Sequence, residues 1–253
     1  MSASHDDRSA WLRRQAGGLV LAAGALLWLF ETHPLDLQVA GWFYDAARGA
    51  FPHRHEWLFD TLLHHGLKSL SVAAGLGAAG LAIAGMAGLW PDWPRRNALA
   101  AALGMALIPL GTALLKHWTH RHCPWDLTPF GGFVPYTTLL QGAPDGYAPG
   151  QCFPAGHAAG GFVWMVWGVA LRSWKPRLAR WALAGGLTLG LLMGVARMAQ
   201  GAHFLSHTLW SAWFAWAVSV GLAAVCRVEL GARGAGGRAG DGPQAASLTS
   251  ACS

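Results

Sequence analysis

The chain has 253 residues, of which 53% are hydrophobic and only 12% are charged. Soluble domains carry about 25% charged residues, so this composition is typical of a protein in lipid and disfavours a disordered, collagen-like or coiled-coil chain. The net charge of +6 could suit nucleic acid. However, the basic residues lie between apolar blocks, as in membrane proteins, and we expect no nucleic-acid partner.

Six stretches are apolar enough to be interpreted as membrane-spanning helices, each of which needs about 20 residues. In chain order they are residues 15–31, 69–90, 98–115, 157–173, 179–196 and 208–226. All are rich in Gly and Ala, which let membrane helices pack closely. The sequence therefore predicts an all-α fold, a six-transmembrane-helix bundle with a long ordered outer loop between helices three and four.

The predicted organisation has three parts. Residues 1–14 form a cytoplasmic N-terminus, residues 15–230 form the six-span membrane domain, and residues 231–253 form a Gly/Ala/Ser-rich, disordered C-terminal tail. Arg13 and Arg14 precede the first apolar run as in a signal peptide. That run ends without the small residues of a cleavage site, so we expect a retained first helix.

The distribution of Lys and Arg predicts the orientation. With the N-terminus inside, the inner segments hold 12 of these residues and the outer segments hold 6, which places both termini in the cytoplasm. Two outer segments are long. Residues 32–67 carry aromatic residues among charges, as interfacial stretches do. Residues 116–156 contain six Pro, and a loop of this length usually has a function.

Three clusters of ionisable residues fall at the outer ends of the predicted spans. They are residues 116–126, residues 153–157 and residues 197–207. Ionisable groups near membrane spans are costly, so each is a functional candidate. The six-helix topology brings all three clusters to one membrane face, and we therefore expect one site.

The residue types in these clusters suit a phosphate group. Lys116 offers a point charge, and Arg121 and Arg197 offer planar donor forks for phosphate oxygens. Backbone amides at Gly156, where a helix starts, add further donors. A neutral His can attack phosphorus and a protonated His can donate to the leaving oxygen, and both states are accessible near neutral pH. Phosphoryl transfer without a metal or cofactor is thus chemically coherent.

The same residues resemble the motifs of the type-2 phosphatidic acid phosphatase superfamily, which also includes the vanadium haloperoxidases. Its three motifs are K-x6-R-P, P-S-G-H and S-R-x5-H-x3-D. The matches are Lys116 and Pro124 in the first, Pro154, Gly156 and His157 in the second (Ala155 for Ser), and Arg197 and His203 in the third (Ala196 for Ser). The resemblance covers about residues 36–228 and is closest to the membrane-bound bacterial branch.

The resemblance implies a role for each matched residue. His203 would be the nucleophile that forms a phosphohistidine, and His157 would protonate the leaving group and then activate water. Lys116 and Arg197 would hold phosphate oxygens, helped by amides near Gly156. The implied protein is a multi-pass phosphatase of the bacterial inner membrane that takes a lipid phosphate or diphosphate from the membrane at its periplasmic face.

Two positions depart from the family pattern. Cys123 stands where the first motif has Arg, and Arg121 is a candidate to supply the missing guanidinium. His207 stands where the third motif has the Asp that orients the nucleophile. It lies four residues after His203, on the same helix face, and can accept a hydrogen bond but supplies no negative charge. Asp126 in the outer loop is another candidate partner.

Cys123 and Cys152 bracket the Pro-rich part of the outer loop. A disulfide between them is expected if the loop faces an oxidising periplasm, and the alternative is two reduced, packed thiols.

Three other functions stay open. His203 and His207 are spaced as metal ligands on a helix can be, with His157 as a third ligand, but this leaves Lys116 and Arg197 unexplained, and we expect no metal. A lipid phosphotransferase would use the same residues. A non-catalytic lipid-binding, transport or scaffold protein with a relic site would explain the departures from the motifs.

Overall fold

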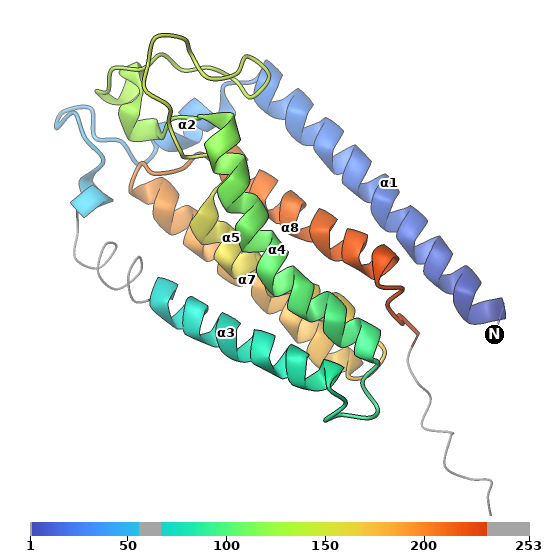
Figure 1. Ribbon diagram of the computed structural model, residues 1–253. Coiled ribbons are helices and arrows are strands. Elements are labelled where there is room, and N and C mark those ends of the chain that lie inside the picture. The colour runs from blue at the N-terminus through green and yellow to red at the C-terminus, as the bar shows by residue number, and fades with distance from the viewer. Residues whose placement is uncertain (1, 56–66, 232–253) are drawn as a thin grey trace, which may run out of the picture.

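In the computed structural model the chain is all-helical over residues 2–55 and 67–231, which are the residues that the structure describes (Figure 1). The helices are α1 (Ser2–Thr32), α2 (Leu35–Gly41), α3 (Leu67–Met86), α4 (Arg95–Thr119), α5 (Gly156–Phe162), α6 (Met165–Ala170), α7 (Pro176–Ala199) and α8 (Leu205–Val225). Within the described ranges, β pairing is limited to two isolated bridges, Asp45 with Ala50 and Leu127 with Val134. The expected disordered tail lies, from residue 232 on, outside them.

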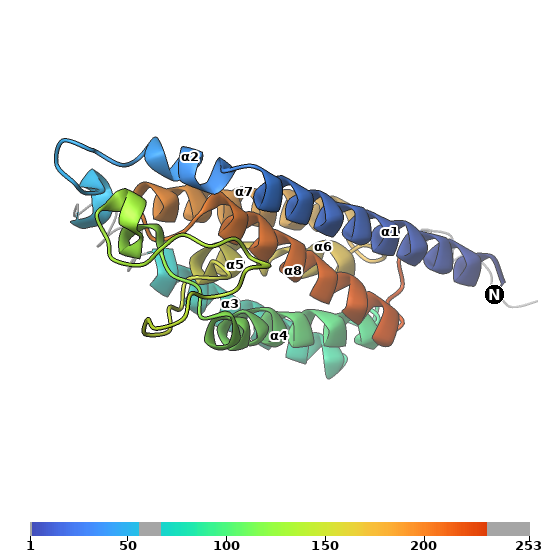
Figure 2. The ribbon, with the colours of Figure 1, turned by 90° about the horizontal axis from the view of Figure 1, so that it is seen from above.

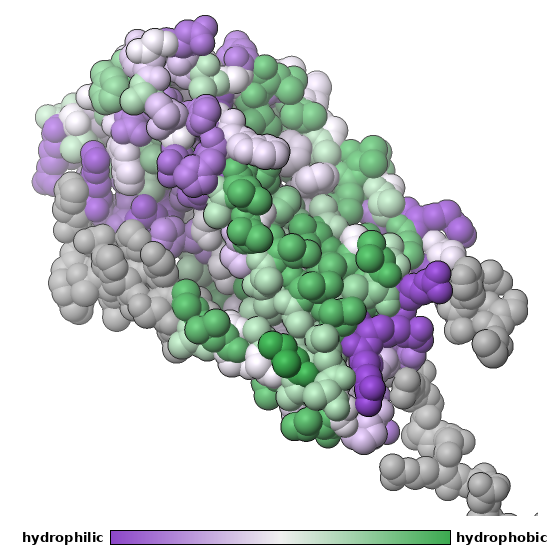
Figure 3. Space-filling view, in the orientation of Figure 1, coloured by the Kyte–Doolittle hydropathy of each residue, from purple (hydrophilic) through white to green (hydrophobic). Residues whose placement is uncertain are grey.

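Four helices are long and apolar enough to cross a membrane. They are Asp7–Thr32, Arg95–Asp126, Pro176–Ala199 and Leu205–Val225, and Val72–Met86 is a shorter apolar helix. An apolar belt covers α3 and α4 in Figure 3, with hydrophilic residues toward the two ends of the bundle. The chain is therefore a membrane protein, and its all-helical fold is confirmed.

The segment 157–173, expected as one continuous span, is divided into α5 and α6. Between them the N–H groups of Trp164, Val166 and Trp167 bond to carbonyls three residues back, which is the tighter 3₁₀ spacing. The pair packs in the centre of the bundle against α7. A side chain at Gly161 would meet the backbone of Gly190, so this close approach requires glycine.

The outermost helices lie at opposite edges of the bundle. α1 runs along α8 at one edge, and α3 lies beside α4 at the other (Figure 2). The indole nitrogens of two tryptophans on α8 donate to α1: Trp213 to the Leu19 carbonyl at 2.9 Å and Trp216 to the Gln15 side chain at 3.0 Å. α1 is thus attached to the bundle through α8.

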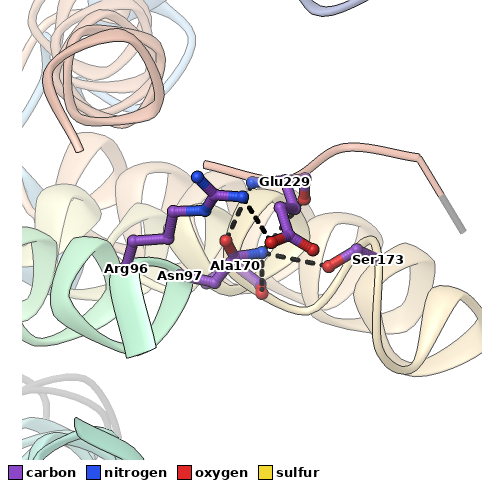
Figure 4. Close-up of polar contacts among 5 residues, drawn as sticks. All are labelled: Arg96, Asn97, Ala170, Ser173 and Glu229. Carbon is purple, nitrogen blue, oxygen red and sulfur yellow. Dashed lines mark hydrogen bonds and ion pairs between the residues drawn. The ribbon is translucent and has the colours of Figure 1, made fainter. Parts of the chain in front are cut away.

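A buried polar network closes the end of the bundle where α4 begins (Figure 4). The Asn97 amide nitrogen donates to the carbonyls of Ala170 and Glu229 and to the Ser173 hydroxyl, at 3.0–3.2 Å. The Glu229 N–H donates back to the Asn97 side chain at 2.9 Å, and the Glu229 carboxylate pairs with Arg96. These bonds fix α4, the end of α6 and the segment after α8 to one another.

The other end of the bundle carries a second, smaller core. Phe51, Phe130 and Tyr44 meet with ring centroids 5.3–5.4 Å apart, and Val134 and Phe204 are buried in the same cluster. The segment 32–67 was expected along the membrane interface. Its residues up to 55 pack their aromatic rings against the loop between α4 and α5, and residues 56–66 lie outside the described part.

Candidate functional site

The three clusters meet at one end of the bundle, where α2, the loop after α4 and the α7–α8 connection lie together (Figure 1). Three hydrogen bonds link them. The Thr119 hydroxyl donates to the Phe153 carbonyl at 2.7 Å, the Ala155 N–H donates to the His207 carbonyl at 3.3 Å, and the Trp125 N–H donates to the Gly201 carbonyl at 3.1 Å. Segments as far as 76 residues apart in the sequence, at Trp125 and Gly201, are thus held together.

A disulfide joins Cys123 to Cys152, with their Cα atoms 5.2 Å apart, a separation typical of such bonds. Next to it the Cys152 N–H donates to the Arg121 carbonyl at 2.8 Å, and the Gly150 N–H donates to the His120 carbonyl at 3.2 Å. The position that holds Arg in the family motif therefore ties the first cluster to the second.

Lys116, in the last turn of α4, lies against the start of α5. Its ammonium donates to the Gln151 carbonyl at 3.1 Å. A Cβ at Gly156 would come within 3.1 Å of the Lys116 Cε and 3.5 Å of its Nζ, so the missing side chain leaves room for the lysine. His157 follows in the first turn of α5, half-buried. The Lys116 ammonium is thereby held at the start of α5, the helix that carries the His157 imidazole.

His203 lies in the tight connection between α7 and α8. The Ala202 N–H donates to the Arg197 carbonyl at 2.9 Å, and Gly201 has a φ of +72° with Phe51 where a Cβ would be. His203 is 4% exposed. Burial lowers its pKa well below the ordinary value, and the positive charges of Lys116 and the other basic groups of the site lower it further. A neutral imidazole is the form that can attack phosphorus.

His207 lies one turn after His203, with the two ring centroids 5.8 Å apart. It is buried edge-on between the rings of Phe153 and Phe204, each at 5.3 Å. The Nδ1 atoms of both histidines are buried, and neither has a hydrogen-bond partner among the described residues. The His207 ring therefore packs beside His203, and no hydrogen bond joins the two side chains there.

The two candidate arginines differ in their surroundings. Arg197, in the last turn of α7, donates from Nη1 to the Gln200 side-chain oxygen at 2.6 Å, and its charge acts on His203. Arg121 donates to the Thr137 hydroxyl at 2.9 Å and also bonds to the Thr137 and Gly142 carbonyls. The structure thus brings Lys116, Arg197, His157, His203 and His207 together and engages Arg121 with the outer loop.

Asp126, the other expected partner, is part of a turn. Its carboxylate accepts the Cys123 N–H at 3.2 Å, which caps the short 3₁₀ helix Pro124–Asp126. This is an ordinary role for Asp beside such a turn.

Two buried polar residues of the site carry no signal in the sequence. Asp36, in α2, is 4% exposed and accepts the Ser206 N–H at 2.9 Å. Burial raises the pKa of Asp36 to about 6, against the opposing effects of its Ser206 hydrogen bonds and of Arg121. Gln200 is the partner of Arg197. Asp36 is 170 residues from Ser206, so no local spacing predicts their contact. Gln200 is an uncharged residue at a variable position of the third motif, so the motif does not predict its contact either.

An apolar groove of about 590 Å³ runs between α3, α4 and α5 and reaches the site. Its walls include Leu76, Met105 and Val163, and its polar lining residues are Thr112, Lys116 and His157. Val72 and Leu76 on its α3 side are largely exposed, as side chains that face lipid are. The groove therefore connects the apolar belt with two of the candidate site residues.

Among the residues that the structure describes, no group of three or more His, Cys, Asp or Glu side chains is arranged to hold a metal ion.

The model of the PAP2 superfamily matches residues 97–228, which is more than half of the chain. The chain belongs to the PAP2 superfamily. Members of this superfamily are generally phosphatases. The family therefore supports a phosphatase-type activity for this membrane protein. The match is shorter than the expected 36–228 and leaves Asp36 outside it. A search of curated proteins and a search of solved structures returned no match.

Proposed function

We propose that the protein is a multi-pass phosphatase that hydrolyses a lipid phosphate or diphosphate through a phosphohistidine. The observation that carries the proposal is the apolar groove that ends at Lys116 and His157. A soluble phosphate would need no such groove. A hydrocarbon chain would bury apolar surface in it while its headgroup meets the basic residues, with about 0.8 kcal/mol gained per methylene.

The chemistry follows from the residues at the end of the groove. His203 attacks the phosphorus, the bond from phosphorus to the ester oxygen breaks, and His157 gives its proton to the leaving oxygen. Lys116 and Arg197 stabilise the negative charge on the other oxygens. His157 then removes a proton from water, which attacks the phosphohistidine and releases phosphate together with free His203. His207 packs against the nucleophile and restricts its ring.

The membrane arrangement is part of the proposal. α1, α3, α4, the α5–α6 pair, α7 and α8 would be the six spans, and the 12-to-6 distribution of Lys and Arg supports both termini in the cytoplasm. The site would then face the periplasm of a bacterial inner membrane. An oxidising periplasm is also the compartment in which the Cys123–Cys152 disulfide would persist.

The test is phosphate release by the purified full chain in detergent, from a panel of long-chain lipid phosphates and diphosphates, with EDTA present. We expect release by the wild type, loss of it in His203→Ala, and retention in the matched control His117→Ala, because His117 is exposed on α4. An acid-labile, alkali-stable phosphoprotein trapped from labelled substrate would identify the phosphohistidine.

Other outcomes would replace the proposal. Transfer of the phosphoryl group to a second lipid, without release, would make the protein a phosphotransferase that uses the same residues. Activity that EDTA abolishes and zinc restores would assign the histidines to a metal. Binding of lipid phosphates with neither release nor transfer would favour a relic site.

A further inference from the structure

Among the described residues of the site, Gln200 is the side-chain amide that is fully buried. It is 1% exposed, directly follows the end of α7 and precedes His203 by three residues. An apolar residue could fill the same space without any polar group to satisfy. The amide therefore needs an explanation.

The contact with Arg197 fixes how the amide is oriented. A guanidinium has donors and no acceptor, so the Gln200 oxygen must face the Arg197 Nη1, 2.6 Å away. The amide nitrogen then points elsewhere, and within the described ranges it has no acceptor. An unsatisfied buried donor is destabilising and is rare in native proteins. Its acceptor is thus expected to be a molecule that binds at the site.

The position of the donor indicates what that molecule is. The amide oxygen and nitrogen share one carbon, so the Gln200 Nε2 lies within about 2.6 Å of Oε1 and within about 5 Å of the Arg197 Nη1. Lys116 and Arg197 contribute only donors to this region. An oxyanion held by Arg197 would place acceptor oxygens next to the amide nitrogen.

The proposed phosphate-binding residues, Lys116 and Arg197, also lack a donor group that the family motif provides. Cys123 occupies the motif Arg position and is committed to the disulfide, and the Arg121 guanidinium is engaged with Thr137 and Gly142. We propose that Gln200 is a phosphate-binding residue, whose oxygen holds the Arg197 guanidinium and whose nitrogen donates to a phosphate oxygen. The inference rests on the proposed function and assigns part of the missing arginine's role to a neutral amide.

The probe is inorganic phosphate, measured by calorimetric binding and as a competitive inhibitor of the full chain in detergent. In Gln200→Leu we expect phosphate affinity to fall roughly 10-fold or more, as for loss of a hydrogen bond to a charged group. Its melting temperature should be unchanged or higher, since the unsatisfied donor is gone. Gln200→Glu keeps an acceptor for Arg197 but replaces the donor with negative charge, so its affinity should fall further. Gln38→Leu, at an exposed glutamine on α2, is the matched control.

Phosphate affinity within about twofold of wild type in both Gln200 variants would overturn the inference and leave the phosphatase proposal intact. Affinity that falls only in step with the melting temperature, in both variants, would make Gln200 a structural residue and would also overturn it. A wild type that binds no phosphate and releases none from any lipid would remove both proposals together.

Discussion

Asp36 accepts hydrogen bonds from both the backbone N–H and the hydroxyl of Ser206, and so joins α2 to the first turn of α8. Phe204, at the N-cap of α8, has no side-chain acceptor for this N–H. A carboxylate from a distant segment thus does what a Ser or Asp at the N-cap usually does. The contact holds the turn that carries His207 and borders His203.

Asp36 makes stability depend on pH. Its pKa of about 6 in the folded protein exceeds the ordinary value of 3.8, so the folded state holds this proton more tightly than the unfolded state. The contribution of Asp36 to stability should therefore fall as pH rises from about 4 to 6 and level off above, by about 3 kcal/mol in total. The lowered pKa of His203 gives a contribution of the opposite sign, so the effect of Asp36 is the difference in slope between wild type and Asp36→Asn.

The measurement for Asp36 is thermal unfolding in detergent across that pH range. Asp145→Asn, which changes an exposed carboxylate in the outer loop, is the control and should keep the wild-type slope. An unchanged slope in Asp36→Asn would show that another group is responsible.

The disulfide should contribute strongly to stability because it closes a loop of 29 residues. In the chain-entropy model such a loop contributes about 3–4 kcal/mol. We expect Cys152→Ser to lower the melting temperature by several degrees, and reductant to have the same effect on wild type but none on the variant. Cys226→Ser, which removes a cysteine that is not in a disulfide, should match wild type. Equal melting temperatures for Cys152→Ser and wild type would contradict this role.

The groove should select for chain length. Gly160 lies on α5 one turn after His157 and lines the groove, and a Cβ there would meet nothing within 4 Å. Gly160→Leu should therefore fold and occupy the space in which the proposed lipid chain would lie. Excluding two methylenes costs about 1.6 kcal/mol, so kcat/KM for a long-chain phosphate should fall roughly tenfold.

The comparison for Gly160 is a short, water-soluble phosphate ester, whose hydrolysis should be unaffected. Gly185→Leu is the matched variant, since this glycine also has open space but is exposed on α7, away from the groove. Equal losses for long and short substrates in Gly160→Leu would mean that the groove is not the chain site.

The sequence predicts the all-helical fold because an apolar run of about 20 residues has few alternatives to a membrane helix. Because successive spans run in opposite directions, the topology predicts that the three clusters lie at one end of the bundle. The predicted family membership is confirmed. The break after Phe162 was not predicted, because the composition is equally apolar on both sides of it. It depends on local hydrogen bonds that spacing does not reveal.

The site is predicted only where a motif states it. Asp36 contacts Ser206, and Gln200 contacts Arg197. No sequence pattern predicts either contact. Arg121 is an opposite example: it has a suitable side chain and lies near a motif, but its guanidinium bonds to the outer loop. His120 has a left-handed φ of 49° and ends α4, so the next residue does not continue the helix face of Lys116.

Arg121 and Arg197 should therefore give opposite results when each is replaced by Met. In the proposed mechanism Arg197 stabilises charge on the phosphoryl oxygens, so its loss should lower kcat/KM roughly 100- to 1,000-fold, beyond the modest fall in melting temperature that an unsatisfied Gln200 oxygen would cause. Arg121 bonds to oxygens of Thr137 and Gly142 in the outer loop, so Arg121→Met should lower the melting temperature while phosphate affinity changes little. Both variants need phosphate binding and thermal unfolding measured on the same preparation. A large loss of phosphate affinity in a fully stable Arg121→Met would return the guanidinium of the first motif to Arg121, because such a result requires its side chain to leave the loop and reach the phosphate.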